Sequence, residues 1–149
     1  MTAFFARADA VETGGLPVLI VIACALIDAD GRVLIAQRPS GKALAGLWEF
    51  PGGKLKAGEA PEACLIRELR EELDIVIEAA CLAPLTFASY AYETFHLLMP
   101  LFICRKWTGS ARPLEGQRLA WVRPGKLREY AMPPADAPLI PALIDTLGP

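Results

Sequence analysis

Three carboxylates fall on one face of a predicted helix near the middle of the chain. Apolar residues at helical spacing predict a helix over 61–73. Glu68, Glu71 and Glu72 would share one arc of this helix, because positions i, i+3 and i+4 are neighbours on a helix surface. Carboxylates so placed repel one another unless a cation lies between them. An oxygen-rich cluster of this kind is the donor set of a hard divalent cation, either Mg²⁺ or, as a substitute, Mn²⁺.

The plainer interpretation of these charges is an exposed helix face with ion pairs of Arg67 with Glu71 and of Arg70 with Asp74. This is the commoner meaning of such a segment. Here, however, the sequence Pro51-Gly52-Gly53 precedes the helix. Glycine allows a ligand to approach the backbone closely, and a helix N-terminus favours anions. Carboxylates for a metal ion beside such a turn indicate chemistry on phosphate.

Strands and helices around this segment must position the carboxylates. Apolar runs bounded by turn residues predict strands at 18–28, 33–36, 48–50, 75–90, 93–106 and 119–122. Pro51-Gly52-Gly53 is expected to end the third strand abruptly, and further helices are expected at 124–130 and 136–147. The fold class is therefore α/β, or α+β by stricter naming, with a mixed β-sheet sandwiched between helices. Four aromatic residues are expected in the core or on a sheet face: Tyr90, Tyr92, Trp107 and Trp121.

The length and charge of the chain fit one domain that does not bind long nucleic acids. The chain has 149 residues, of which 54% are hydrophobic, and a formal net charge of −2. It can therefore bury one core, and it lacks the basic composition of a nucleic-acid-binding domain. We expect residues 1–16 to form a flexible leader and residues 17–149 to form the single domain.

Neither export nor membrane insertion is expected from the sequence. The longest apolar run, 17–27, is shorter than the roughly 18 residues that a membrane-spanning helix needs. Residues 1–16 do not resemble a secretory signal. The four cysteines lack CxxC spacing and stand in apolar surroundings, so we expect buried reduced thiols. These features predict a cytoplasmic protein with no membrane partner, and we expect a monomer or a weak dimer.

Gly53, Glu59 and the run 67–75 resemble the Nudix box, the signature of the Nudix hydrolase superfamily. The pattern is GX5EX7REUXEEXGU, in which U is a bulky aliphatic residue. Every specified position matches except that Asp74 stands where the pattern has Gly. This position is expected to close the helix in the left-handed conformation, which Asp tolerates better than most other residues. The resemblance extends over most of residues 17–147.

Within the superfamily, the chain is similar to the MutT-type nucleoside triphosphate pyrophosphohydrolases, which release a nucleoside monophosphate and pyrophosphate. The resemblance implies a Mg²⁺ site with these ligands: the Gly52 carbonyl and the carboxylates of Glu68, Glu71, Glu72 and Glu115. It also implies that Glu68 or Glu115 is the general base, and Arg67 is expected to orient the carboxylates. The implied substrate-binding residues are Arg38, Glu49, Phe50, Pro51, Gly52, Gly53, Lys54 and Asp136.

Asp136 bears on which base the site would bind. In MutT-type enzymes that remove 8-oxo-dGTP, an Asn at this place contacts the damaged purine, whereas related enzymes with Asp look to favour cytidine or oxidised pyrimidine nucleotides. An ionised Asp only accepts hydrogen bonds, and burial would favour the protonated form, which also donates. The alternative role for Asp136 is the N-cap of the last helix.

Three hypotheses follow from the resemblance. We expect hydrolysis of 8-oxo-dGTP, in nucleotide-pool sanitation and mutation avoidance. CTP or a modified pyrimidine triphosphate is the alternative substrate. A non-catalytic nucleotide-binding module with the same fold is the third possibility.

Overall fold

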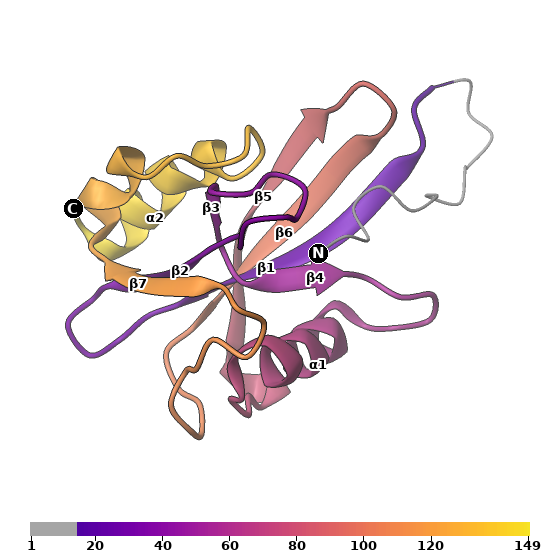
Figure 1. Ribbon diagram of the computed structural model, residues 1–149. Coiled ribbons are helices and arrows are strands. Elements are labelled where there is room, and N and C mark those ends of the chain that lie inside the picture. The colour runs from indigo at the N-terminus through magenta and orange to yellow at the C-terminus, as the bar shows by residue number, and fades with distance from the viewer. Residues whose placement is uncertain (1–14) are drawn as a thin grey trace.

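Two β-sheets and two α-helices make up the described part of the chain, residues 15–149 of a computed structural model (Figure 1). The four-stranded sheet has the order β4-β1-β6-β5 and consists of β1 (Val18–Leu26), β4 (Gly52–Lys54), β5 (Leu82–Ala91) and β6 (His96–Cys104). The three-stranded sheet has the order β3-β2-β7 and consists of β2 (Val33–Gln37), β3 (Trp48–Glu49) and β7 (Arg118–Val122). The α-helices are α1 (Pro61–Leu73) and α2 (Ile140–Leu147). Residues 1–14 of the predicted leader lie outside the described residues.

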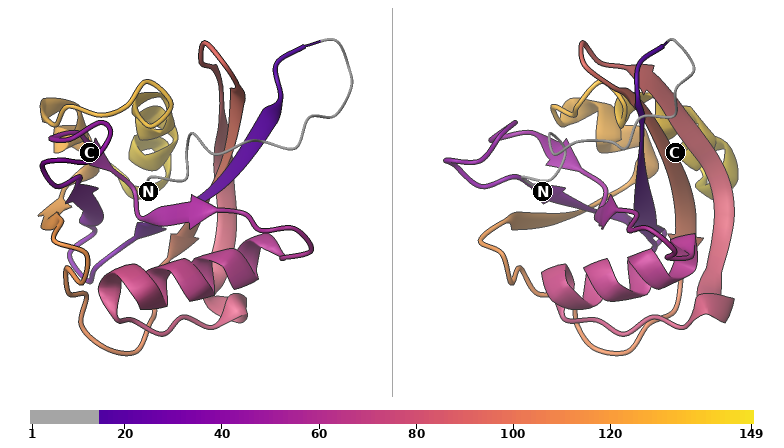
Figure 2. Two further views of the ribbon diagram at one scale, coloured as in Figure 1. Left: turned by 45° about the vertical axis from the view of Figure 1, so that its right-hand side comes forward. Right: turned by 90° about the vertical axis from the view of Figure 1, so that its right-hand side faces the viewer.

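Both faces of strand β1 are buried because the strand lies inside its sheet, between β4 and β6, with a hydrophobic core on either side. It pairs antiparallel with β4 and parallel with β6, so its sheet is mixed, as predicted. Leu19 and Val21 belong to the core that contains residues of α2, whereas Ile22 and Cys24 belong to the core that contains residues of α1. Figure 2 shows the strands between the two helices. Burial on both faces explains why β1 is a continuous apolar run, and the predicted sheet between helices is confirmed.

Helix α1 has the predicted start and end. It begins at Pro61, where the missing N–H costs nothing. It ends at Asp74, which has the left-handed conformation (φ 58°, ψ 38°) and donates its backbone N–H to the Arg70 carbonyl. The buried side of the helix includes Leu69 and Leu73, which are fully buried. The glutamates of the Nudix-box pattern are therefore left on the sides of α1 that face away from the core.

The expected break after the third strand is confirmed, because β3 ends at Glu49, but the two glycines start a new strand, β4, in the other sheet. Gly53 lies opposite Ile22 of β1 in an antiparallel pair. A Cβ atom on Gly52 would collide with the Ile22 carbonyl oxygen, and one on Gly53 would collide with the Glu68 carboxylate. Glycine is thus required here by the close approach of β1 and α1 on either side, and the pairing with β1 overrides the local turn preference.

Four other predicted elements differ in extent or type. The strand predicted at 75–90 begins only at Leu82, because the 3₁₀ helix η2 (Ala79–Cys81) precedes it. The strand predicted at 93–106 is shortened to β6 at both ends. The helix predicted at 124–130 is the 3₁₀ helix η3 (Pro124–Glu129), and that at 136–147 starts with the 3₁₀ helix η4 (Ala137–Leu139) before α2. Pro138 and Pro141 lack backbone N–H donors, which delays the start of the α-helix.

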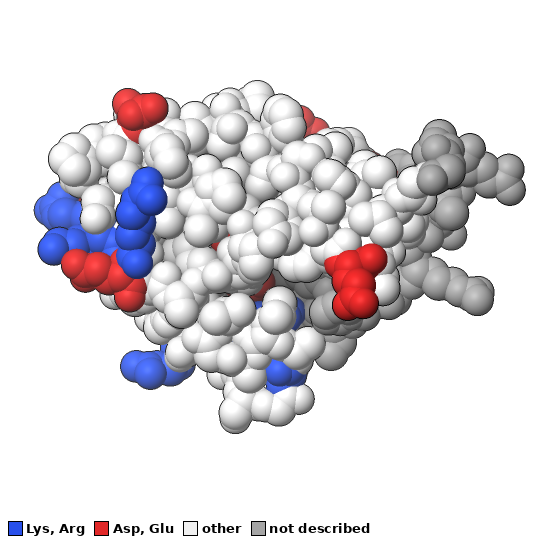
Figure 3. All heavy atoms as spheres, turned by 90° about the horizontal axis from the view of Figure 1, so that it is seen from above, with Lys and Arg blue, Asp and Glu red and all other residues white. Residues whose placement is uncertain are grey.

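The four cysteines are free thiols. Cys24, Cys64 and Cys104 are buried as expected, but Cys81 is only half-buried. Burial raises the pKa of the Cys64 thiol to about 12, which keeps it protonated. The face seen in Figure 3 is largely uncharged, with basic side chains gathered at one edge beside acidic ones. Within the described residues, no helix is long and apolar enough to cross a membrane.

Candidate active site

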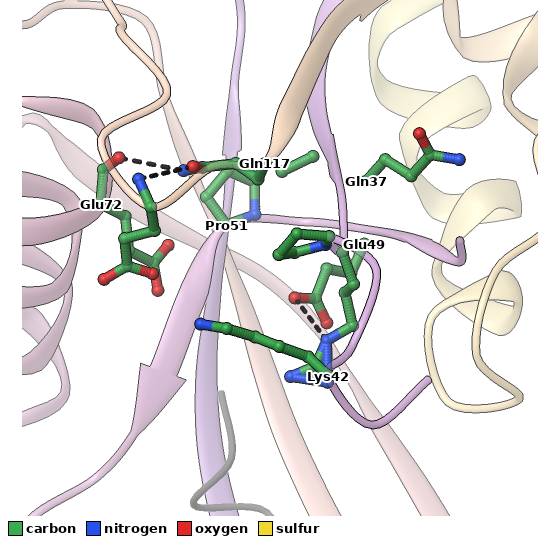
Figure 4. Close-up of a pocket in the computed structure, with 10 residues that line it drawn as sticks. Gln37, Lys42, Glu49, Pro51, Glu72 and Gln117 are labelled. Carbon is green, nitrogen blue, oxygen red and sulfur yellow. Dashed lines mark hydrogen bonds and ion pairs between the residues drawn. The ribbon is translucent and has the colours of Figure 1, made fainter. Parts of the chain in front are cut away.

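The C-terminal part of α1 borders a small cavity of about 40 Å³, which we call the acidic cavity (Figure 4). Its lining residues are Ala36, Gln37, Arg38, Pro39, Lys42, Glu49, Pro51, Glu72, Glu115 and Gln117. Glu72 comes from α1, Glu49 from β3 and Glu115 from the loop before β7. The Gln117 amide donates to the Glu72 carbonyl (3.0 Å) and accepts from the Glu115 N–H (2.8 Å). These two hydrogen bonds hold the loop against α1, so that carboxylates distant in sequence face one space.

The Glu72 carboxylate lies in an environment that disfavours its charge. Burial raises the pKa of Glu72 well above its usual range, and the charges of Glu68, Glu115 and Glu49 raise it further. A cation would relieve this repulsion, and an all-oxygen donor set fits a hard divalent ion. As the side chains stand, no three Asp, Glu, His or Cys groups among residues 15–149 are placed to enclose a metal ion. The donor chemistry therefore fits a divalent cation, and binding one requires the glutamates to turn towards it.

Arg67 is the centre of an ion-pair network next to the acidic cavity. Its Nε and Nη2 atoms each lie 2.9 Å from a carboxylate oxygen of Glu59, and its Nη1 atom lies 2.8 Å from Glu68 Oε1. The predicted pair with Glu71 is present but long (3.9 Å), and the Glu71 side chain is 58% exposed. This geometry is what an orienting role for Arg67 requires. Glu59 was not predicted as the main partner of Arg67, although it is a fixed position of the Nudix box.

Replacing Glu59 by Gln is expected to lower the free energy of unfolding by about 1–2 kcal/mol at pH 7, because a charged pair of hydrogen bonds is lost. The hydrogen bonds from Arg67 lower the pKa of Glu59 from 4.5 to about 2. A lowered pKa means that this stabilisation is fully present above pH 4.5 and is lost as the pH falls towards 2. Urea unfolding from pH 7 to pH 2.5 should therefore show the gap between wild type and Glu59→Gln closing below pH 4.5. The exposed Glu78→Gln variant is the control; an equal loss there would show that Glu59 has no special role.

Arg38 and Lys42 supply the positive charge beside the acidic cavity. Arg38 is only 5% exposed; its Nη1 atom donates to the Ala43 carbonyl (2.9 Å) and its Nε atom lies 3.5 Å from Glu49 Oε1. Burial raises the pKa of Glu49, and the charge of Arg38 opposes this rise. The Lys42 side chain extends across the cavity in Figure 4. A fixed guanidinium and a flexible ammonium both suit phosphate oxygens. Lys42 was missed because a lysine in a polar loop gives no signal in the sequence.

A second cavity of about 110 Å³, the aromatic cavity, adjoins the acidic cavity and shares Glu49 with it. Its lining residues are Leu44, Glu49, Tyr92, Phe95, Leu97, Pro133 and Asp136. The rings of Tyr92 and Phe95 stack with their centroids 5.0 Å apart. Tyr92 also packs against the hydrophobic core, as expected for it, but its place in this cavity was not predicted. An apolar cavity with two carboxylates suits a flat, aromatic ligand that carries N–H groups.

Asp136 is not the cap of the last helix, and that interpretation is wrong. Its side chain makes no capping hydrogen bond; its Oδ2 atom instead accepts the Phe50 N–H (3.3 Å) across the molecule. Asp136 is 5% exposed, and burial, with the charge of Glu49, raises its pKa well above the usual range. The side chain therefore borders the aromatic cavity with one oxygen committed to Phe50.

The structure brings together some of the predicted site residues and separates others. Those that line the acidic cavity are Arg38, Glu49, Pro51, Glu72 and Glu115. Gly52, Gly53 and Lys54 form β4, where Gly53 lies against the Glu68 carboxylate. Phe50 is buried in the core and takes part through its N–H, and Glu71 points into solvent. The residues predicted to hold a metal are therefore not gathered around one point in the described part of the chain.

The fold is that of a Nudix domain. The NUDIX domain model matches residues 22–142, and the chain belongs to this family. Within the family it is a hydrolase of the MutT type, as its relatives show. Enzymes of the family use divalent cations, which agrees with the oxygen donors at the acidic cavity.

Similar proteins cover nearly the whole chain. A CTP pyrophosphohydrolase of Escherichia coli is 36% identical over 128 residues, which span 85% of this chain and 92% of the relative. An 8-oxo-dGTP diphosphatase of Haemophilus influenzae is 36% identical over 135 residues, with 85% of this chain and 93% of the relative covered. Among solved structures, the E. coli ORF135 protein superposes with a TM-score of 0.76 at 30% identity, covering 89% of this chain and 92% of its own. A MutT structure from a study of the Aliivibrio salmonicida and Vibrio cholerae proteins superposes with a TM-score of 0.73 at 28% identity. It covers 87% of this chain and 98% of its own.

Proposed function

We propose that the chain hydrolyses nucleoside triphosphates to nucleoside monophosphates and pyrophosphate with Mg²⁺, and that 8-oxo-dGTP is its leading substrate. In this role it removes oxidised nucleotides from the cytoplasmic pool before they enter DNA. The observation that carries the proposal is the adjacency of the two cavities through Glu49. A base in the aromatic cavity would leave its phosphates beside the glutamates and Arg38. The names of the similar enzymes from E. coli and H. influenzae support this class of substrate.

The proposed chemistry needs one proton acceptor and a means of neutralising the phosphates. Water attacks one of the two phosphorus atoms of the anhydride between the α- and β-phosphates and gives its proton to the general base. The bond from that phosphorus to the bridging oxygen breaks, the other product leaves with the bonding electrons, and nucleoside monophosphate and pyrophosphate result. The metal site would use the Gly52 carbonyl and the carboxylates of Glu68, Glu71, Glu72 and Glu115. When bound, Mg²⁺ supplies positive charge to the phosphates and lowers the pKa of water.

Glu68 and Glu115 remain the two candidates for the general base, and they differ in their surroundings. Glu115 lines the acidic cavity from a loop, whereas Glu68 is held by Arg67 at 2.8 Å. The ion pair with Arg67 fixes the direction of the Glu68 carboxylate and engages its Oε1 atom. We propose that Arg67 positions Glu68 and does not contact the reacting phosphorus.

A pyrimidine triphosphate such as CTP is the second candidate substrate, and Asp136 is the observation that favours it. A carboxylate that borders the aromatic cavity can accept a hydrogen bond from the exocyclic amine of cytosine. The similar E. coli enzyme named CTP pyrophosphohydrolase supports this alternative. The same carboxyl, when protonated, can donate a hydrogen bond to a carbonyl oxygen of a purine, so its position is also compatible with 8-oxo-dGTP.

Pyrophosphate release from a panel of nucleotides tests the proposal. The panel contains 8-oxo-dGTP, dGTP, CTP, dCTP and an oxidised pyrimidine triphosphate, each with Mg²⁺, with Mn²⁺ and with a chelator. We expect metal-dependent release of pyrophosphate, with the highest kcat/KM for 8-oxo-dGTP. A highest kcat/KM for CTP would support the second candidate. Tight nucleotide binding without turnover of any member would overturn the enzyme proposal and leave a binding module.

A further inference from the structure

A third concave surface adjoins the acidic cavity. This surface is an open groove of about 510 Å³ between the loop after β2 and the start of β7. Its lining includes Gln37, Arg38, Ser40, Gly116 and Arg118. We call it the outer groove. Neither the proposed hydrolysis nor the proposed base recognition has yet given it a role.

The acidic cavity shares lining residues with both of the other concave surfaces. The acidic cavity shares Glu49 with the aromatic cavity, and it shares Gln37, Arg38 and Pro39 with the outer groove. The acidic cavity is therefore continuous with both, whereas the aromatic cavity and the outer groove share no lining residue. A nucleoside triphosphate has a base, reacting phosphates and a terminal phosphate in that order. With the base in the aromatic cavity and the reacting phosphates beside Glu72, the outer groove is a surface that the terminal phosphate can reach past Arg38.

The outer groove has a cation suited to that phosphate. Arg118 is the first residue of β7 and lies directly opposite Gln37 of β2, so the two side chains are neighbours. Arg118 is exposed, and no hydrogen bond or ion pair within residues 15–149 engages its guanidinium. Arg38, by contrast, is already bound to the Ala43 carbonyl and to Glu49. A guanidinium presents two parallel donors to phosphate oxygens, and Arg118 has them available.

We propose that the outer groove binds the terminal phosphate of a nucleoside triphosphate and that Arg118 is the residue that binds it. This inference rests on the proposed function and adds to it the residue that distinguishes triphosphates from diphosphates. A diphosphate bound in the same way ends at the acidic cavity and does not reach Arg118. After cleavage, the same contact holds the outer end of the departing pyrophosphate.

Kinetics of Arg118→Ala test this assignment. We expect the KM for the best triphosphate to rise about fivefold, since one exposed charged contact contributes about 1 kcal/mol. The inhibition constant of the matching nucleoside diphosphate is expected to stay the same, because the diphosphate lacks the γ-phosphate. Arg118→Lys keeps the charge and should recover part of the loss. Arg128→Ala removes an exposed arginine of η3, away from all three cavities, and is the matched control.

Two results would overturn the assignment: an unchanged KM in Arg118→Ala, or equal weakening of triphosphate and diphosphate. Calorimetric binding of inorganic tripolyphosphate provides a measurement that does not depend on turnover. If the wild type releases no pyrophosphate from any nucleotide, the proposed function fails. Weaker binding of tripolyphosphate by Arg118→Ala than by Arg128→Ala would then still support the outer groove, and equal binding would reject it.

Discussion

Replacing Glu72 by Gln is expected to lower kcat at least a thousandfold while the free energy of unfolding stays the same or increases. The loss of activity follows because Glu72 is the half-buried carboxylate of the proposed metal site, and an amide cannot neutralise a divalent cation. The expected stability follows from the surroundings of Glu72, where burial and three other carboxylates disfavour its charge. Gln keeps the shape of the side chain and removes that repulsion. Activity and stability thus move in opposite directions.

Pyrophosphate release and urea unfolding in metal-free buffer measure the two effects. Mg²⁺ is expected to raise the Tm of the wild type and to have little effect on Glu72→Gln, because a ligand stabilises the state that binds it. The exposed Glu93→Gln variant removes a carboxylate at the β5–β6 turn and should behave like the wild type in both assays. Full activity in Glu72→Gln would reject the metal assignment. A clearly destabilised variant would contradict the account of repulsion around Glu72.

Replacing Asp136 by Asn is expected to change the ratio of 8-oxo-dGTP to CTP turnover about tenfold or more in favour of 8-oxo-dGTP. An amide always presents both a donor and an acceptor, as a purine edge with a carbonyl and an N–H requires, whereas the carboxyl must hold a proton to donate. A hydrogen bond of about 1.4 kcal/mol that is made to one base only changes the ratio tenfold. The kcat/KM values of the two substrates measure this ratio directly. An unchanged ratio would remove Asp136 from base recognition.

The same variant has an expected effect on the pH dependence of stability. Burial raises the pKa of Asp136, so the folded state holds the proton more tightly than the unfolded state does. The stabilisation from this carboxyl is present below its ordinary pKa of about 4 and is lost as the pH rises through the raised value. Asp136→Asn lacks this loss and should become more stable relative to the wild type as the pH increases. Asp145→Asn, an exposed residue of α2, should show no such trend.

The parts of the site that the sequence predicted well are those built by local contacts. Helix α1, the start at Pro61, the left-handed Asp74 and the shared face of the glutamates all depend on residues within a few turns of one another. Periodicity and fixed spacing therefore sufficed for them. The same local reasoning found the end of β3 but missed strand β4, because Gly52 and Gly53 pair with β1, a strand far away in the sequence.

The parts that could not be predicted depend on contacts between distant segments. The hydrogen bond of Asp136 joins it to Phe50, 86 residues away, and local reasoning offered the helix cap in its place. Asp136, Tyr92 and Leu44 belong to three separate segments and meet only in the folded molecule, at the aromatic cavity. The exposed Arg118 had no signal at all, because its position beside Gln37 follows from the register of β2 with β7. A single sequence names the residues that line such cavities, but it does not show which of them lie next to one another in the folded molecule.

The parallel pairing of β1 with β6 also constrains the order in which the molecule assembles. Val18 lies opposite His96, and Leu26 lies opposite Cys104. This edge of β1 can therefore be paired only after β6 has been synthesised. The whole Nudix box lies inside the chain segment between these partners. Contacts that close long segments slow folding, to roughly milliseconds or longer in domains of this kind. During synthesis on the ribosome, β1 must therefore remain unpaired on that edge while the box emerges. A chaperone that shields apolar strands is expected to raise the yield of active protein.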